Sequence, residues 1–189
     1  MTQSVYFMLM TIATVLVMLF QLRTLIQSTS ADYYSNITQA VLKLTNPLVN
    51  IPLWARARMG SIWIAGFVVA FILSEVVWVL LNFVAMPIGL PLAVIAGAFL
   101  FTKSFGYLII VLLLAQALCS WLPSTRNLSF YFGQLTQPIV APVQRIIPPI
   151  GMIDISLMIV LIALYALNHL IYKVLAAVSQ DLMILWAIV

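Results

Sequence analysis

Two stretches of the chain decide its fold, Leu44-Thr45-Asn46-Pro47-Leu48-Val49 and Leu135-Thr136-Gln137-Pro138-Ile139-Val140, which stand ninety-one residues apart. Matches between Leu, Ile and Val carry little weight in so apolar a chain, but matched polar, proline and glycine positions indicate a duplicated unit. Two copies of one unit in a membrane protein usually pack about a symmetry axis. Further positions repeat at the same spacing: Asn36 with Asn127, and Gly60 with Gly151.

The composition places the chain in a membrane. It is 65% hydrophobic and 6% charged, whereas soluble domains carry about 25% charged residues. Four apolar runs have the length of about 20 residues that a helix needs to cross the hydrocarbon core: residues 5–26, 62–84, 105–122 and 155–175. The expected fold is an all-α integral membrane protein with four transmembrane helices, arranged as two parallel helix-hairpin repeats. No Lys or Arg precedes the first run, so we expect it to stay as a helix and not to be cleaved as a signal peptide.

The expected units are a first repeat at 1–86, a re-entrant or interfacial segment at 87–104, a second repeat at 105–180 and an interfacial tail at 181–189. The middle segment holds about a dozen apolar residues ended by Lys103, a length that suits a re-entrant or interfacial segment. If residues 88–102 crossed, the two connectors would lie on opposite sides. In the tail, Trp186 suits an interfacial anchor.

Each connector opens with apolar residues at helical spacing: Ile37, Ala40, Val41 and Leu44 in the first, and Leu128, Tyr131, Phe132 and Leu135 in the second. We expect amphipathic helices in the headgroup plane. Proline lacks an amide donor, so the prolines that follow are expected to end each helix. Asp154 is expected to cap the last span, in preference to forming a recognition loop with Ser156.

Basic residues predict the orientation. Lys43, Arg56 and Arg58 fall in the first connector, and Arg126 and Arg145 in the second. By the positive-inside rule both connectors face the cytoplasm and both termini the periplasm. Lys43, Arg56 and Arg58 have an alternative role in holding anionic lipid headgroups, but orientation is the preferred interpretation. The basic residues are dispersed, which excludes nucleic acid as a partner and leaves the bilayer, other membrane proteins or self-association.

Polar side chains within spans are candidates for function because they are costly to bury. Glu75 lies in the second span, and Asn168 and His169 lie in the fourth. Measured from Gly60 and Gly151, Glu75 and His169 differ in depth by about 4.5 Å if the two repeats are in register. One interpretation is a proton or cation site formed by Glu75 with His169 or Asn168. The preferred one is a hydrogen-bonded strut or a protonated Glu75 in the bundle core.

The sequence lacks the motifs of an enzyme. It holds a single cysteine, Cys119, and one histidine, and it contains no CxxC, HExxH, glycine-rich phosphate loop or Ser/His/Asp set. We therefore expect no catalytic residues, no metal site and no cofactor. An intramembrane enzyme remains the least favoured alternative.

Around the second copy the chain resembles the YggT family of small bacterial membrane proteins, whose relatives include the YlmG proteins of Gram-positive bacteria and plastids. The residues that carry this resemblance are Thr136, Pro138, Pro142, Arg145, Pro148, Gly151 and Asp154. The resemblance covers nearly the whole chain and implies a bacterial inner-membrane protein linked to osmotic stress tolerance and to potassium or ion homeostasis. Other members are tied to cell-division morphology, plastid nucleoid distribution and assembly of a b-type cytochrome complex.

That spread of roles implies a membrane adaptor that binds other membrane proteins. The chain departs from the family pattern at Gln137, Gln144 and Leu157, and the first copy has Trp63 where the second has Asp154. Function carried by the motif is therefore expected mainly in the second copy. The favoured function is a non-enzymatic scaffold or assembly factor. The alternative is a channel or transporter component for potassium or protons that uses Glu75 and His169.

Overall fold

A computed structural model describes residues 3–29, 31–51, 54, 57–60, 62–84, 86–146 and 155–189. The described residues form seven α-helices, a 3-10 helix η1 (Pro123–Thr125) and a hairpin in which β1 (Arg58–Met59) pairs antiparallel with β2 (Ile62–Trp63). Gly60 turns the hairpin with a φ of 63°, a conformation that glycine adopts without strain. The helices are α1 (Gln3–Ser28), α2 (Asn36–Val49), α3 (Ala65–Val84), α4 (Leu90–Trp121), α5 (Arg126–Ile146), α6 (Ile155–Val178) and α7 (Gln180–Ile188).

Among the described residues, four helices are long and apolar enough to cross a membrane: α1, α3, α4 and α6. This confirms the expected all-α class and four helices with the length and composition of membrane spans. The 20 residues of α3 match the hydrocarbon core, because a helix rises about 1.5 Å per residue and the core is about 30 Å thick. With 32 residues, α4 is about 48 Å long and exceeds that thickness.

The length of α4 contradicts the expected boundary between a separate segment at 87–104 and a membrane helix that begins at residue 105. Residues 90–121 form one helix, and Lys103 lies inside it. The physical reason is that no proline occurs between Pro91 and Pro123, so nothing in the backbone interrupts the helix. The separate segment at 87–104 is therefore not a distinct element of secondary structure, although its place relative to the bilayer stays a prediction.

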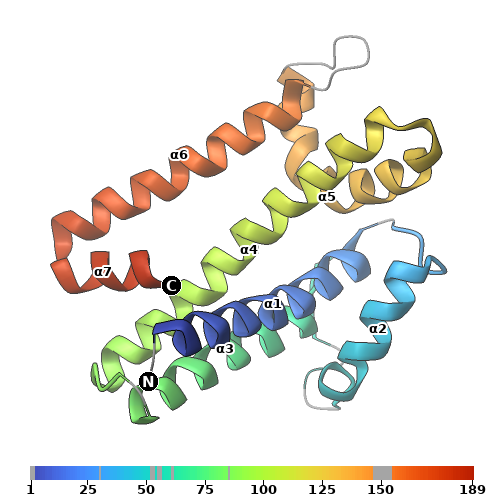
Figure 1. Cartoon of the computed structure of the whole chain (residues 1–189). Coiled ribbons are helices and arrows are strands. Elements are labelled where there is room, and N and C mark those ends of the chain that lie inside the picture. The colour runs from blue at the N-terminus through green and yellow to red at the C-terminus, as the bar shows by residue number, and fades with distance from the viewer. Residues whose placement is uncertain are drawn as a thin grey trace.

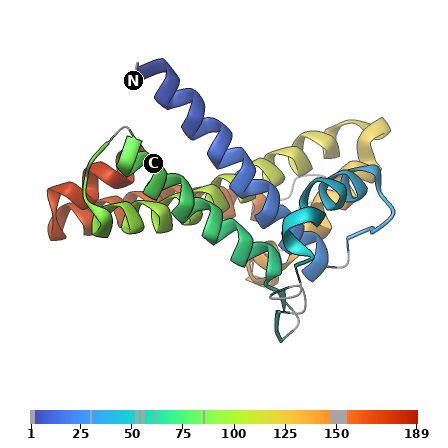
Figure 2. The same cartoon turned by 90° about the horizontal axis from the view of Figure 1, so that it is seen from below.

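The central helix is α4, which crosses the molecule between α6 on one side and α1 with α3 on the other (Figure 1). Helices α1 and α4 run in one direction, and α3 and α6 run in the opposite one. Both views therefore show α2 and α5 at the same end of the bundle, with the N-terminus and the turn between α3 and α4 at the other end (Figure 2).

Two glycines let the helices of the first half pack closely. A Cβ on Gly66 of α3 would lie 2.5 Å from the carbonyl oxygen of Phe20 on α1. A Cβ on Gly97 of α4 would lie 2.6 Å from Oε2 of Glu75 on α3. Small residues at such crossings allow the backbones to approach, as is common between membrane helices. On the same side of α4, the Gln21 side chain of α1 donates a 2.8 Å hydrogen bond to the carbonyl of Phe101.

The largest group of buried side chains lies where the connector helices meet α1, α4 and α6. It joins residues far apart in the sequence: Leu25, Ile26, Val41, Leu108, Ile109, Leu112, Leu113, Tyr131, Leu135, Val140, Leu157 and Val160. Because these side chains come from both halves of the chain, the two halves share one core at the connector end.

The buried face of α2 is not the predicted apolar face. Thr38, Val41 and Thr45 are buried, whereas Leu44 is 66% exposed. The buried threonines are tolerated because their hydroxyls are bonded: Thr38 to the Tyr131 hydroxyl at 2.8 Å, and Thr45 to the Val41 carbonyl at 2.6 Å. Helix α2 thus packs on the protein through a partly polar face and leaves Leu44 uncovered.

The expectation that proline ends the connector helices is wrong. Pro47 lies inside α2, and Pro138 and Pro142 lie inside α5. All three prolines are on the exposed side of their helices. A proline leaves the carbonyl one turn earlier without its amide donor, and on an exposed helix face that carbonyl stays accessible to other donors.

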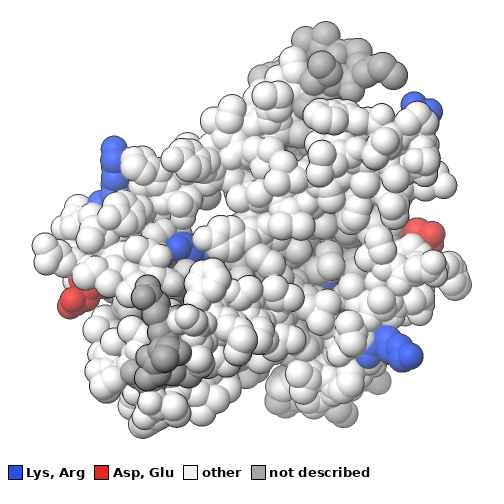
Figure 3. All heavy atoms as spheres, viewed as in Figure 1, with Lys and Arg blue, Asp and Glu red and all other residues white. Residues whose placement is uncertain are grey.

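Charged side chains are few and isolated on the face drawn in Figure 3, where uncharged atoms cover nearly the whole surface. Such a surface suits a lipid environment. In water, the protein would expose a far larger apolar area than soluble monomers do.

Candidate functional site

Glu75 lies at the contact between α3 and α4. Both of its carboxyl oxygens are buried, and neither has a hydrogen-bond partner among the described residues. The carboxyl group sits over Gly97, whose missing side chain provides the space. A carboxyl group without a partner in such a place is costly when ionised, so the geometry suits its protonated form.

The predicted contact of Glu75 with Asn168 or His169 is not formed. Glu75 meets α4 at Gly97, whereas Asn168 shares a cavity with Lys103, six residues further along α4. Six residues correspond to about 9 Å along the helix. In addition, α3 and α6 lie on opposite sides of α4 (Figure 1). The predicted depth difference of about 4.5 Å assumed that the two repeats lie in register. The displacement along α4 shows that they do not.

His169 and Lys173 lie on the exposed side of α6. Only 17% of the most apolar stretch of α6 is buried, compared with 28% to 33% in the other three membrane-spanning helices. Lys173 is five residues from the end of α6, so its long side chain can reach the interface. His169 is nine residues from that end and has no such reach.

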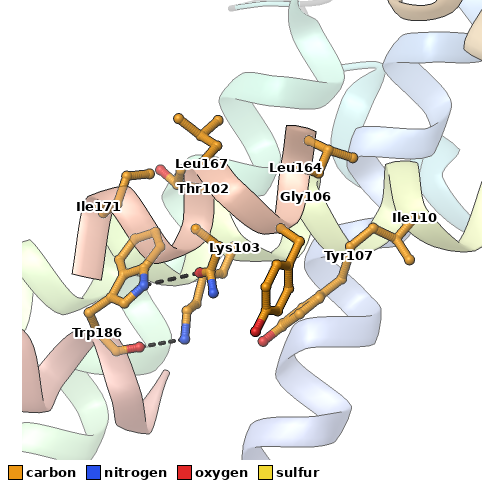
Figure 4. A pocket seen from close by; sticks show the side chains of 11 residues that line it. Thr102, Lys103, Gly106, Tyr107, Ile110, Leu164, Leu167, Ile171 and Trp186 are labelled. Carbon is orange, nitrogen blue, oxygen red and sulfur yellow. Dashed lines mark hydrogen bonds between the residues drawn. The ribbon is translucent and has the colours of Figure 1, made fainter. Parts of the chain in front are cut away.

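A cavity of about 200 Å³ lies between α4, α6 and α7. Figure 4 shows Lys103 and Tyr107 of α4 and Trp186 of α7 around it. The Lys103 ammonium donates to the carbonyl of Trp186, and the Trp186 indole donates to Oδ1 of Asn168 at 3.1 Å. Trp186 is 4% exposed, so it is not the interfacial anchor that was predicted but a side chain packed inside the protein.

Arg23 of α1 is a buried cation that the sequence alone did not predict as a site residue. It is 3% exposed, and its guanidinium donates to Oγ1 of Thr45 at 2.8 Å and to Oδ1 of Asn46 at 2.7 Å. Longer bonds reach the Leu42 carbonyl at 3.3 Å and Oδ1 of Asn50 at 3.2 Å. All these acceptors belong to α2 or its C-cap, so one arginine joins α1 to the connector helix. An arginine near the end of a span, followed in the connector by two asparagines four residues apart, Asn46 and Asn50, was the available signal.

Thr136 of the second copy, which matches Thr45 of the first, also forms a hydrogen bond with a polar side chain of a membrane-spanning helix. Thr136 is fully buried, and its hydroxyl donates to Oε1 of Gln116 on α4 at 2.8 Å. Thr45 and Thr136 occupy matched positions of the two repeats, so in each repeat this threonine bonds a polar side chain of the preceding membrane helix.

The other residues of the family motif contribute to the outside of α5. Pro138 and Pro142 are exposed. Arg145 lies in the last turn of α5, where a positive charge interacts favourably with the negative end of the helix dipole. Pro148, Gly151 and Asp154 lie outside the described residues. Of the first-connector cations, Lys43 is exposed, Arg58 stacks over the Trp63 ring at 4.3 Å, and Arg56 lies outside the described residues.

A groove with both polar and apolar walls runs between the two connectors. We call it the connector groove; its volume is about 690 Å³, and its walls come from residues 32–37, at and just before the start of α2, and from the start of α5. The matched asparagines Asn36 and Asn127 both line it, and Asp32 and Arg126 bring opposite charges to it. The groove walls also include Ser35, Ile37, Leu128, Phe130, Tyr131 and Gln134. A hydrogen bond of 2.8 Å between Thr38 and Tyr131 joins the two helices beside the groove.

Metal ligation finds no support in the described residues, which contain no group of three or more His, Cys, Asp or Glu side chains placed to hold a metal ion. Cys119 is a free, half-buried thiol on α4.

Comparisons with known proteins point to one family. The CCB3/YggT family model matches residues 95–175, from α4 to α6. The chain is 33% identical to the uncharacterized protein YggT of Escherichia coli (strain K12) over 178 residues, which is 94% of both chains. An uncharacterized Vibrio alginolyticus protein is 30% identical over 171 residues, 88% of this chain and 92% of its own. No solved structure matches the chain.

Proposed function

The chain belongs to the YggT family, and from this we propose that it is a non-enzymatic scaffold or assembly factor of the bacterial inner membrane, linked to osmotic stress tolerance. In this proposal the two connectors form the working surface and bind another membrane protein. The observation that carries the proposal is the connector groove, which draws its walls from both copies of the repeated unit.

The chemistry of the groove suits a peptide segment of a partner protein. Amide side chains such as Asn36, Asn127 and Gln134 both donate and accept hydrogen bonds, which matches the alternating groups of a peptide backbone. Asp32 and Arg126 supply one charge of each sign, and Phe130 is 70% exposed at the wall. Exposed aromatic side chains at such places are common binding anchors.

The duplication is part of the proposal, and the helix bounds support it. Shifting α2 by ninety-one residues gives 127–140, within α5, and shifting α3 gives 156–175, within α6. Two units in the same orientation put α2 and α5 at one end of the bundle (Figure 1). The positive-inside rule then assigns that end to the cytoplasm and the termini to the periplasm.

The second candidate function is an ion path for potassium or protons. The observation in its favour is the pair of unpartnered, buried carboxyl oxygens of Glu75. An ion also needs a wet route through the membrane, and the contact of Glu75 with Gly97 fills the space around the carboxyl group. His169 does not complete this site, because its helix α6 lies on the other side of α4 from α3 (Figure 1).

Flux in liposomes separates the two functions. The purified chain is reconstituted, and potassium and proton flux are measured for wild type and Glu75→Gln, with empty liposomes as the baseline. The scaffold predicts flux at baseline for both proteins and a stable partner that co-purifies from the native membrane. Flux that falls on the Glu75→Gln change contradicts the scaffold and establishes the ion path.

A further inference from the structure

The cavity between α4, α6 and α7 has features that the scaffold function does not use. Its walls are mostly apolar, formed by side chains such as Ile110, Leu164 and Ile171. Lys103 brings a positive charge into these apolar surroundings. Its ammonium lies over the Trp186 ring at 5.1 Å and donates to the Trp186 carbonyl. No carboxylate lines the cavity, so this charge has no counter-ion there.

The polar groups around the cavity have hydrogen-bond donors to spare. An ammonium has three N–H groups, and for Lys103 the described residues supply one acceptor, the Trp186 carbonyl. Asn168 uses its oxygen to accept from the Trp186 indole, which leaves its NH₂ group available. Tyr107 and Tyr165 add hydroxyl groups to the wall. Unused donors beside an unneutralised cation favour an anionic ligand, because a charge-assisted hydrogen bond is stronger than a neutral one.

Helix α7 holds these groups in place. Trp186 contacts both Lys103 and Asn168 through different atoms, so one residue of α7 fixes a cation from α4 and an amide from α6 (Figure 4). The indole also packs edge-on against Phe99 of α4, with ring centroids 5.1 Å apart. A site whose donors are positioned before binding loses less entropy when a ligand arrives.

The size and the opening of the cavity limit the ligand. A volume of about 200 Å³ is below the range of roughly 300 to 1,000 Å³ that is typical of sites for drug-sized molecules. Tyr165 and Leu167 line the cavity and are 75% and 50% exposed, so it opens to the outer surface of α6. A membrane helix presents that surface to lipid, and a lipid chain can therefore lie outside while its headgroup enters.

We propose that this cavity binds the anionic headgroup of a membrane amphiphile, a carboxylate or a phosphate, with Lys103 and Asn168 as its donors. The acyl chain follows the apolar wall toward the open side near Leu167. This site is separate from the connector groove, and the scaffold function does not depend on it.

The test uses three photoactivatable lipids that carry a diazirine on the acyl chain: a fatty acid, a phosphatidylglycerol and a phosphatidylcholine. The full chain is placed in phosphatidylcholine nanodiscs, irradiated with each probe, and analysed by mass spectrometry for adducts on residues 102–110 and 164–171. At least one anionic probe is expected to label these residues at least tenfold more than the zwitterionic probe. A fatty acid that labels alone identifies a carboxylate ligand, and a phosphatidylglycerol that labels alone identifies a phosphate ligand.

Variants assign the labelling to the cavity. Lys103→Gln is expected to lower labelling by the anionic probe at least tenfold, and Lys103→Arg is expected to keep most of it. The matched control is Lys173→Gln, the same change at an exposed lysine of α6, which is expected to leave labelling unchanged. If Lys103→Gln loses its helical circular dichroism, Asn168→Leu serves in its place with an expected loss of about threefold.

Three results overturn the proposal. One is equal labelling by the phosphatidylcholine probe, and another is an absence of labelling by every probe. The third is labelling that survives Lys103→Gln in a folded protein, because the cation would then play no part in binding.

Discussion

Replacing Arg23 with methionine is expected to release α2 from α1. The guanidinium makes its two shortest hydrogen bonds to side chains of α2, at 2.8 Å to Thr45 and 2.7 Å to Asn46. Methionine keeps an unbranched apolar side chain in the buried position but donates no hydrogen bond. Thr45 and Asn46 then lose a charged donor, and α2 keeps only its apolar contacts and the bond from Thr38 to Tyr131.

The magnitude follows from those two bonds. A hydrogen bond to a charged group contributes about 1.5 to 3 kcal/mol. The lower value applies here, because Asn46 lies on the exposed side of α2, where water replaces part of the loss. Two such bonds amount to about 3 kcal/mol, and since each 1.4 kcal/mol is a factor of ten, the opening equilibrium of α2 rises about a hundredfold.

Hydrogen–deuterium exchange read by mass spectrometry measures this opening locally. In Arg23→Met, amide protection in α2 is expected to fall about a hundredfold while protection in α3 stays within threefold of wild type. Arg58→Met is the matched control, because Arg58 is exposed and stacks on Trp63 without bonding α2. Unchanged protection of α2 in Arg23→Met, or an equal loss in α3, refutes the claim that Arg23 joins α1 to α2.

Further predictions concern the helix crossings and the connector contact. Gly97→Ala is expected to destabilise the protein by about 1 to 3 kcal/mol through overpacking, and Glu75→Ala in the same chain is expected to recover much of this, because the three nearest atoms all belong to the Glu75 carboxyl group. Thermal unfolding in detergent measures both, and additive losses would contradict the contact. Gly66→Ala is expected to lower the unfolding temperature, and adding Thr24→Ala is not expected to restore it, because the Phe20 carbonyl oxygen remains 2.5 Å from the new Cβ. A restored unfolding temperature in the double variant would show that the backbone at Phe20 moves to make room. Tyr131→Phe is expected to cost about 1 kcal/mol by removing the bond to Thr38, and an unchanged unfolding temperature would show that this bond is replaced.

The membrane-spanning helices could be predicted from the sequence because their cause is local. The run 155–175 became α6 (Ile155–Val178), and 5–26 became α1 (Gln3–Ser28), since apolar length alone decides such a helix. The expected boundary near Lys103 was wrong because no proline interrupts residues 92–121, and a lysine alone does not end a helix. The charge of this lysine is accommodated inside a continuous helix by the carbonyl of Trp186, which is eighty-three residues away in the sequence.

The candidate site was harder to predict because it depends on how the repeats sit relative to each other. A depth difference of only about 4.5 Å between Glu75 and His169 follows only if the repeats lie side by side in register, and the structure instead sets Glu75 against Gly97. Spacing within a sequence cannot show such a displacement, since it arises from packing between helices. The same holds for Asn36 and Asn127, whose shared groove appears only when α2 and α5 meet.

The proposal that the connectors bind a partner is tested most directly by site-specific photo-crosslinking in living cells. A photoreactive phenylalanine replaces Phe130, which lines the connector groove and is 70% exposed, or Phe83, which is 71% exposed in the last turn of α3. That end of α3 lies at the other end of the bundle from α5 (Figure 1). The scaffold predicts one protein adduct of defined mass at Phe130, none at Phe83, and loss of that adduct when Asn36 and Asn127 are both changed to alanine. No protein adduct at Phe130, or the same adduct at both positions, would contradict it.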